Sequence, residues 1–530
     1  MEPRVRLPGL QEVLAGGRLL WQLGPHLRRP LDVAESRAIL ESRLVRRELD
    51  FLWVLRHTIY DQPLSPYRQL LEWAGCAYGD VERLVRRDGV EGALRALYRQ
   101  GVYLTVDEFK GRRPAVRGSA EIEVRPARLR NYVAATHLFG GTSGSRSPRT
   151  QVPMDLSFIR DRAVNACLTL HARGAVEWRK AVWADPGGCL ALSIRFSSFG
   201  QPAARTFSLV DLADPGLDSS YLWGARALAW GSRLAGVPIP AAEHVPIDAP
   251  LAIARWVREV RDAGARPHLW TYVSPAVRLC RASAAAGIDL TGAAFTVTGE
   301  PLTDARLAAM REVGAEAVAD YGSAESGFIG YGCLAASLPD DVHLFHDLHA
   351  LLQLGAGEGT SELPAGALLV SSLRPSAPVI LLNVSMGDRA EVVRRACGCP
   401  LERLGWVTHL HTIRSYEKLT AGGMTFLDTD VIRVLDEVLP GRFGGGPTDY
   451  QLAEEETPDG GVRIRLLVHP ALGTLDANDV IETFLRTLGS GSPADRMMAL
   501  HWRRAGVLVV DRQVPRATST GKVLHLVRVP

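Results

Sequence analysis

The residues best suited to chemistry include a lysine close to the end of the chain. The segment 515–526 reads PRATSTGKVLHL and contains Lys522, one of four lysines among 61 basic residues; the others are Lys110, Lys180 and Lys418. A lysine ammonium is a compact point charge, whereas the guanidinium of arginine is a wide planar fork. A lysine kept inside a Thr-Gly-Lys turn is therefore a candidate for a role that arginine does not suit. Lys110 and Lys180 are expected to be structural.

Two more groups of candidate residues directly follow predicted strands. Glycine lets a backbone approach a planar ligand, tyrosine offers a stacking face, and a carboxylate can hold a magnesium ion. Taken alone, each group is as typical of an ordinary turn as of a ligand-binding loop. The first group is Gly299, Glu300 and Pro301, and the second is Tyr321, Gly322, Ser323, Ala324 and Glu325.

A third candidate is the loop 139–150, which reads FGGTSGSRSPRT. Backbone N–H groups freed by glycine, together with hydroxyl side chains, can wrap phosphate oxygens. The loop lacks the spacing of a P-loop, so that motif is not predicted. A flexible surface loop is the alternative interpretation.

These groups must be positioned by strands and helices that alternate along the middle of the chain. Apolar strands and amphipathic helices follow one another from 251 to 322. Repeated strand–helix–strand units predict an α/β fold with mostly parallel sheets covered by helices, and ligands bind beyond the carboxyl ends of such strands. The chain divides into a helical region (1–125), an α/β core (126–413) and a small, mobile α+β domain (414–530).

Composition excludes several classes of protein. The 530 residues are 46% hydrophobic and 22% charged, as in globular proteins, and the net charge of +3 shows no basic excess for nucleic acid. No run approaches eighteen apolar residues, so no membrane span is expected. Seven cysteines do not predict a disulfide scaffold, and the start of the chain has no apolar signal core. We therefore expect a cytoplasmic protein.

In this order the motifs resemble those of the adenylate-forming superfamily of acyl-CoA ligases and adenylation domains. The resemblance covers residues 60–530 and adds Asp388, in NVSMGDRAEV, and Arg414, in HTIRSYEKL. Within the superfamily, SPYRQLLEWAG, GVYLTVDEFKG and CGCP are similar to the phenylacetate–CoA ligase branch. The resemblance implies a small mobile C-terminal domain and a hinge at Arg414, Tyr416 and Glu417, with Lys418 either at that hinge or on the surface.

The resemblance also implies a role for each candidate residue. Tyr321 and the backbone of 299–301 would frame adenine, with Gly322 and Ser323 beside them. Asp388 would bind the ribose hydroxyls, and Arg414 the ribose or a phosphate. Glu325 would ligate Mg²⁺, and Lys522 would bridge the attacking carboxylate and the α-phosphate of ATP. The β- and γ-phosphates would lie on Gly141, Thr142, Ser143, Gly144 and Ser145.

Four departures from the family pattern are expected to slow catalysis without abolishing it. Each removes a polar contact worth on the order of 1 kcal/mol. The charges of Glu325, Asp388 and Lys522 are all retained. The departures are Arg146 for proline, Ala324 for Thr or Ser, Met386 for Thr, and Tyr416-Glu417 for two aspartates.

Four residues could form a structural zinc site. Cys397 and Cys399 place two thiols on one turn, which suits a tetrahedral metal. Resemblance to the same branch adds Cys333 and His343 as the remaining ligands of a Cys₃His site. Buried free cysteines beside a surface histidine are the alternative.

The expected activity is ATP- and Mg²⁺-dependent activation of a small carboxylic acid as an acyl-adenylate, followed by transfer to the thiol of coenzyme A. Segments 197–205 and 327–332 are expected to contribute to the acid pocket, and their glycine and aromatic residues favour an aromatic acid. One alternative is transfer to an amine or to a carrier protein. Another is a nucleotide-binding protein that has lost catalysis.

Overall fold

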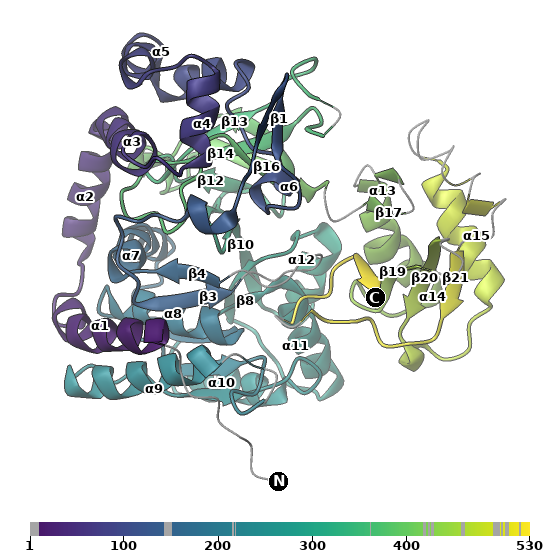
Figure 1. The fold of residues 1–530 in the computed structure, drawn as a ribbon. Coiled ribbons are helices and arrows are strands. Elements are labelled where there is room, and N and C mark those ends of the chain that lie inside the picture. Colours follow the sequence, from purple (N-terminus) through teal and green to yellow (C-terminus); the bar gives the residue numbers. More distant parts are fainter. Residues whose placement is uncertain are drawn as a thin grey trace.

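The computed structural model describes residues 10–141, 151–214, 217, 219–360, 362–416, 420–421, 424–425, 429–456, 462–490, 499, 502–503, 508–518 and 521–529 (Figure 1). Its centre is a twelve-stranded sheet. One half of this sheet is parallel, in the order β7-β6-β5-β8-β9-β10. These strands are β5 (Arg179–Ala184), β6 (Arg205–Ser208), β7 (Ala242–His244), β8 (Pro267–Tyr272), β9 (Ala294–Thr298) and β10 (Glu316–Ser323).

Helices cover the parallel half, as the alternation of strands and helices predicts. Asp185 caps α8, where it accepts a hydrogen bond from the backbone N–H of Gly188, so this helix starts directly after β5. Every residue of β8 and β9 is buried, which is typical of parallel strands packed on both faces. The α/β class is confirmed. The helices are α7 (Leu156–Ala172), α8 (Pro186–Ser197), α9 (Ser219–Leu234), α10 (Leu251–Asp262), α11 (Val273–Ala285) and α12 (Asp304–Arg311).

The other half of the sheet is antiparallel, which the strand–helix pattern did not predict. It continues from β10 in the order β11-β12-β16-β15-β14-β13. Hairpins need no crossover helix, so the sequence there lacks the helical signal that marks the parallel half. The strands are β11 (Gly327–Gly332), β12 (Val342–Leu344), β13 (His349–Gln353), β14 (Ala367–Ser372), β15 (Val384–Arg394) and β16 (Thr408–Ser415).

Residues 10–125 are mainly helical. Their helices are α1 (Leu10–Leu27), α2 (Val33–Val45), α3 (Arg47–Leu55), α4 (Pro66–Trp73), α5 (Tyr78–Arg99) and α6 (Val106–Phe109). Helices α2 to α6 pack on the same large core, whereas α1 contributes to a smaller cluster with α7, α8 and α9. Two hairpins follow, made by β1 (Ala115–Arg117) with β2 (Ala120–Ile122) and by β3 (Leu138–Gly141) with β4 (Gln151–Met154). Within the described residues, no helix is both long and apolar enough to cross a membrane.

A second hydrophobic core lies in the C-terminal part, on the right of Figure 1. It is built on the four-stranded sheet β21-β20-β19-β22. Between β21 and β22 the chain passes along the large core, which contains Val523, before β22 completes the small sheet. The elements are α13 (Thr429–Arg433), α14 (Leu439–Phe443), β19 (Tyr450–Glu456), β20 (Val462–Val468), α15 (Ala477–Leu488), β21 (Leu508–Asp511) and β22 (Leu526–Val529).

Candidate functional site

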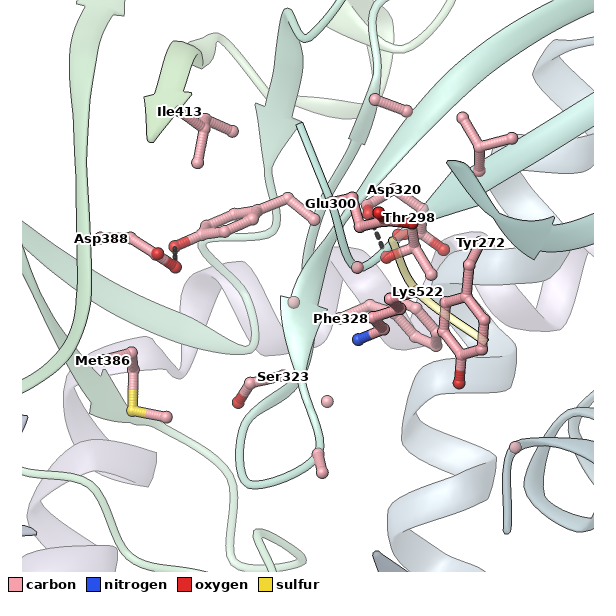
Figure 2. A pocket seen from close by; sticks show the side chains of 18 of the residues that line it. Tyr272, Thr298, Glu300, Asp320, Ser323, Phe328, Met386, Asp388, Ile413 and Lys522 are labelled. Carbon is pink, nitrogen blue, oxygen red and sulfur yellow. Dashed lines mark hydrogen bonds between the residues drawn. The ribbon is translucent and has the colours of Figure 1, made fainter. Parts of the chain in front are cut away.

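A cavity of about 380 Å³ lies at the carboxyl ends of β8, β9 and β10 (Figure 2). Its wall combines residues from the large sheet with residues from the last segment of the chain. It brings together most of the residues predicted to bind nucleotide, namely Gly299, Glu300, Pro301, Tyr321, Gly322, Ser323, Glu325, Asp388, Arg414 and Lys522.

The other predicted residues are not among the lining residues that the structure describes. Gly141 ends β3, and its neighbours Thr142, Ser143, Gly144 and Ser145 lie outside the described residues. Tyr416 lies away from the cavity, with its hydroxyl 2.5 Å from Oγ of Ser385. Glu417 and Lys418, the rest of the predicted hinge, also lie outside the described part of the chain.

Lys522 reaches the cavity because a tight turn presents it and Gly299 makes room for it. Thr518 closes the turn, accepting at Oγ1 the backbone N–H of Lys522 at 3.1 Å. A Cβ added to Gly299 would lie 2.7 Å from both Cε and Nζ of Lys522, and the φ of +80° at Gly299 also favours glycine. The ammonium lies 4.8 Å from the centroid of the Tyr272 ring. Lys522 is thus placed at the point where the loop after β9 begins.

Tyr321 and Asp388 contact each other on the cavity wall. The phenol of Tyr321 donates to Oδ2 of Asp388 at 3.0 Å, and Figure 2 shows this bond. Burial, and then the Asp388 carboxylate, raise the pKa of Tyr321 well above its usual range, so the phenol stays a donor. The tyrosine ring and the carboxylate therefore lie together at one side of the cavity.

The side chain of Glu300 is hydrogen-bonded within the protein. Its two carboxylate oxygens accept the backbone N–H of Ser274 at 2.9 Å and the Ser274 hydroxyl at 2.5 Å. Arg306 lies 3.5 Å from the same carboxylate. Negative charge at the first turn of α11 is favourable. Only the backbone around Glu300 is left to contact a ligand, as the resemblance implies.

Glu325 carries an ion pair that the sequence analysis did not predict. Nζ of Lys110, at the end of α6, lies 2.8 Å from Oε1 of Glu325, and both residues line the cavity. The two side chains are mostly buried, 22% and 8% exposed. Lys110 therefore lies on the cavity wall, and the expectation that it is structural stays a prediction. Its rarity as a lysine was the one available signal.

Arg414 is held by a carboxylate that the sequence analysis missed. Its Nη1 donates to Oδ2 of Asp340 at 2.7 Å. The same carboxylate accepts the backbone N–H groups of Thr412 and Ile413 at 3.1 and 2.8 Å. Asp340 therefore joins the loop before β12 to β16 and orients Arg414 at the cavity wall.

The inner part of the cavity lies between the sheet and helices α7 and α8. Trp270, Asp320 and Phe328 line it from the sheet, and Arg162 and Arg195 from the helices. Phe328 lies within the predicted segment 327–332. The other predicted segment, 197–205, contributes no lining residue, so that expectation is wrong. Helix α8 runs back from the carboxyl edge of the sheet, and Arg195, in its last turn, is the last of its residues to line the cavity.

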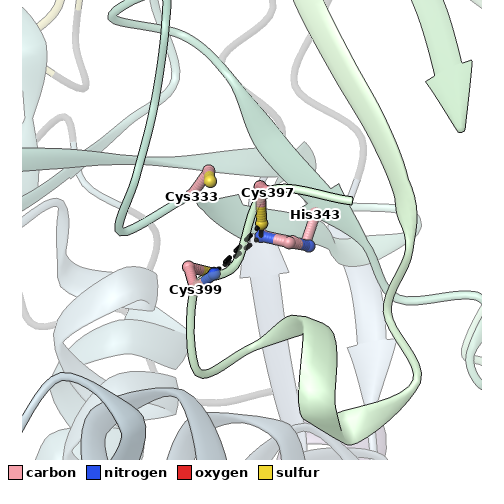
Figure 3. A group of neighbouring side chains, drawn as sticks. All are labelled: Cys333, His343, Cys397 and Cys399. Carbon is pink, nitrogen blue, oxygen red and sulfur yellow. Dashed lines mark hydrogen bonds between the residues drawn. The ribbon is translucent and has the colours of Figure 1, made fainter. Parts of the chain in front are cut away.

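A separate cluster holds the four residues of the predicted zinc site (Figure 3). The ligand atoms of Cys333, His343, Cys397 and Cys399 all lie within 4.8 Å of one another. Nδ1 of His343 is 2.6 Å from the carbonyl oxygen of Trp406, so Nε2 is left to face the thiols. Nε2 lies 3.2 Å from Sγ of Cys399 and 3.7 Å from Sγ of Cys397.

These four side chains have the donor set that tetrahedral zinc requires, and the Trp406 carbonyl orients the imidazole of His343. Burial lowers the pKa of His343 to about 4, so the imidazole is neutral and can donate its lone pair. Glu402 accepts the backbone N–H groups of Cys397 and Gly398 at 2.8 and 2.6 Å, which holds the turn that presents both thiols. The predicted residues are therefore in place for a metal.

Comparison with known proteins gave matches among solved structures only. No family model and no curated protein matches the chain. An O-succinylbenzoate coenzyme A synthetase from Bacillus subtilis, in complex with ATP and magnesium ion, matches with a TM-score of 0.45 and 12% identity over 74% of this chain and 70% of that one. The anthranilate CoA ligase AuaEII, in complex with anthranoyl-AMP, gives 0.42 and 12% over 81% and 73%.

An amide bond synthetase from Marinactinospora thermotolerans matches with a TM-score of 0.39 and 14% identity, over 90% of this chain and 92% of that one. All three names are those of ligases or synthetases. At these TM-scores and identities, the interpretation of the site rests on the residues of this chain.

Proposed function

We propose that the protein joins a carboxylic acid to AMP in the 380 Å³ cavity and then transfers the acyl group to the thiol of coenzyme A. One observation supports this above the others. Lys522, from the last segment of the chain, lies against Gly299, in a cavity that also contains Tyr321, Glu325 and Asp388. These residues come from distant parts of the sequence and match the motif order of the adenylate-forming superfamily.

In the first half-reaction a carboxylate oxygen of the acid attacks the α-phosphorus of ATP, and diphosphate leaves with the bonding electrons. Negative charge gathers on the five-coordinate phosphorus, and the Lys522 ammonium would neutralise it. Tyr321 and the backbone of 299–301 would frame the adenine. Asp388 would accept hydrogen bonds from the ribose, and Arg414 would contact the ribose or a phosphate.

Magnesium would be held by Glu325, whose carboxylate supplies the hard oxygen ligand that this ion prefers. Bound there, the ion would neutralise charge on the phosphates of ATP. Without magnesium, Lys110 neutralises the same carboxylate, with its Nζ 2.8 Å from Oε1 of Glu325. The chain thus keeps a cation beside Glu325 in either condition.

In the second half-reaction the thiol attacks the acyl carbon and AMP leaves. We propose that, between the two half-reactions, the small domain, 414–530, turns about the segment 414–417 and withdraws Lys522. The two parts have separate hydrophobic cores, which supports movement as rigid bodies. We also propose a structural zinc ion at Cys333, His343, Cys397 and Cys399. Metal analysis of the purified protein should find one zinc per chain, and its absence would remove this part of the proposal.

Carboxylate-dependent exchange of labelled diphosphate into ATP tests the first half-reaction. A panel of aryl, amino and fatty acids should contain at least one that supports exchange, and Lys522→Ala should lower its rate by about 100-fold or more. Binding of ATP without exchange for any acid would favour a catalytically inactive relative. Full exchange by the alanine variant would refute the role of Lys522.

The acceptor is tested separately, because nothing in the cavity requires a nucleotide-linked thiol. Enzyme, ATP and the best acid are incubated with coenzyme A, with simple amines, or with a carrier protein, and the products are weighed. We expect the acyl-CoA mass. An amide or an acylated carrier protein in its place would support the corresponding alternative and would leave the adenylation step intact.

A further inference from the structure

An aromatic wall leads from Lys522 into the inner part of the cavity. The Lys522 ammonium lies 4.8 Å from the ring centroid of Tyr272. The centroid of Trp270 lies 5.9 Å from that of Tyr272, and the centroid of Phe328 lies 5.9 Å from that of Trp270. The guanidinium carbon of Arg195 is 4.3 Å from the Phe328 centroid. A continuous row of rings therefore connects the proposed reacting centre to a buried arginine.

Apolar side chains of α7 and α8 line the same cavity as this wall. They include Phe158, Ile159, Ala191 and Leu192. A space bounded by aromatic rings on one side and by helix side chains on the other fits a flat apolar body. This geometry favours an aromatic ring over a charged or branched group.

The inner end of the cavity holds two opposite charges that do not pair with each other. Arg195 and Asp320 are only 7% and 6% exposed. Nε of Arg195 and Oδ1 of Asp320 have no hydrogen-bond partner among the described residues. The other oxygen, Oδ2 of Asp320, accepts the indole N–H of Trp270 at 3.4 Å. Within the described chain no ion pair joins the two, so a donor and an acceptor are left open.

Both charges also border a second, smaller cavity of about 20 Å³. That volume is enough for one water-sized group. Burial raises the pKa of Asp320 to about 7 and lowers the pKa of Arg195 to about 10, which shows how little solvent reaches either group. A small polar group at this point would satisfy buried atoms that water reaches poorly.

We propose that the acid activated by this protein is aromatic and carries a ring hydroxyl on the side away from its carboxyl group. The hydroxyl accepts a hydrogen bond from Arg195 and donates one to Asp320. This inference rests on the proposed function and names its substrate class.

Among common ring substituents, the hydroxyl fits this pair best. It donates and accepts at once, so it supplies a hydrogen-bond partner to each of the two buried groups. An aromatic amine donates but accepts poorly, a methyl group leaves both charges unpaired, and a carboxylate would be repelled by Asp320.

The test is diphosphate exchange with matched acids. Benzoate, phenylacetate and cinnamate are each compared with their 3-hydroxy, 4-hydroxy, 4-amino and 4-methoxy derivatives. The three parent acids vary the distance between the ring and the carboxyl group, and the derivatives vary the ring substituent. We expect one hydroxylated acid to exceed its parent in kcat/KM by about 10- to 100-fold, as for a charge-assisted hydrogen bond. Preference for unsubstituted, amino or fatty acids would overturn the inference and leave adenylation intact. No exchange with any acid would instead overturn the proposed function.

Two variants locate the preference in the protein. Arg195→Met and Asp320→Ala should each lower the ratio of kcat/KM between the hydroxylated acid and its parent by about tenfold or more. Because the readout is a ratio, partial loss of stability affects both substrates alike. Arg173→Met is the matched control, since Arg173, like Arg195, lies over an aromatic ring but is not among the residues that line the main cavity. A ratio unchanged in both test variants would refute the assignment of these residues.

Discussion

A buried ion pair joins the two parts of the molecule, and its removal should separate the two half-reactions. Nε of Arg306, on α12, lies 3.1 Å from Oδ2 of Asp436, which belongs to the C-terminal core region. The side chains are 1% and 0% exposed. Thr303 donates to Oδ2 of Asp436 at 2.9 Å, and Nε2 of His525 lies 3.0 Å from Oδ1 of Asp436 and from Nη2 of Arg306. These contacts hold the small domain in the orientation that presents Lys522.

The substitution Asp436→Ala would remove the nearer of the two carboxylates beside the buried Arg306 guanidinium, leaving Glu300 at 3.5 Å. Losing one partner of a buried ion pair costs about 3–5 kcal/mol, or roughly a hundred- to several thousand-fold in an equilibrium constant. The protein can relieve that cost by separating α12 from the small domain, which returns Arg306 to water. We therefore expect the docked orientation to lose population while the large core stays folded.

The assay compares the two half-reactions in one preparation. Diphosphate exchange, which needs Lys522 in place, should fall by about tenfold or more, whereas acyl transfer from a synthetic acyl-adenylate should be retained. Asp479→Ala is the control, since Asp479 pairs with Arg442 at 2.7 Å with both side chains 45% exposed, and such surface pairs contribute about 0–1 kcal/mol. Equal loss of both half-reactions in a folded protein, or loss of neither, would refute the reasoning.

Three further predictions concern the cavity. Gly299→Ala should reduce exchange strongly with little change in fold. The added Cβ would lie 2.7 Å from Nζ of Lys522, and the φ of +80° at this position favours glycine. Exchange at the wild-type rate would contradict the placement of Lys522. Lys110→Met should lower the magnesium concentration for half-maximal exchange by about fivefold, because it removes the cation that competes for Glu325; a higher requirement would mean that Lys110 assists the phosphates instead. Burial raises the pKa of Asp320 to about 7, above its unfolded value of about 3.9, so the native state holds an extra proton between these values. Stability should therefore decline from about pH 4 to about pH 7, and Asp320→Asn should flatten that decline in denaturant titrations, whereas an unchanged slope would show that the carboxyl group does not titrate this way.

The sequence by itself determined the local structure that positions the nucleotide residues. Apolar strands alternating with amphipathic helices from 251 to 322 predicted α10, β8, α11, β9, α12 and β10, and the structure has all six. The carboxyl ends of parallel strands share one edge of a sheet. The residues that follow β9 and β10 were therefore expected to meet, and Gly299 and Tyr321 line one cavity. The assigned roles stay predictions until the variants are measured.

Only the tertiary structure decided which charges pair around that cavity. Lys110 meets Glu325, Asp340 meets Arg414, and Arg306 meets Asp436, although 74 to 215 positions separate the partners. The pattern of residues along the chain also predicted neither the antiparallel half of the sheet nor the inner end of the cavity near Asp320. Strand and helix periodicity records which side of an element faces the core, because burial acts on each residue separately. The partner of a buried charge is set by how distant elements pack together, and no local spacing in the sequence records that packing.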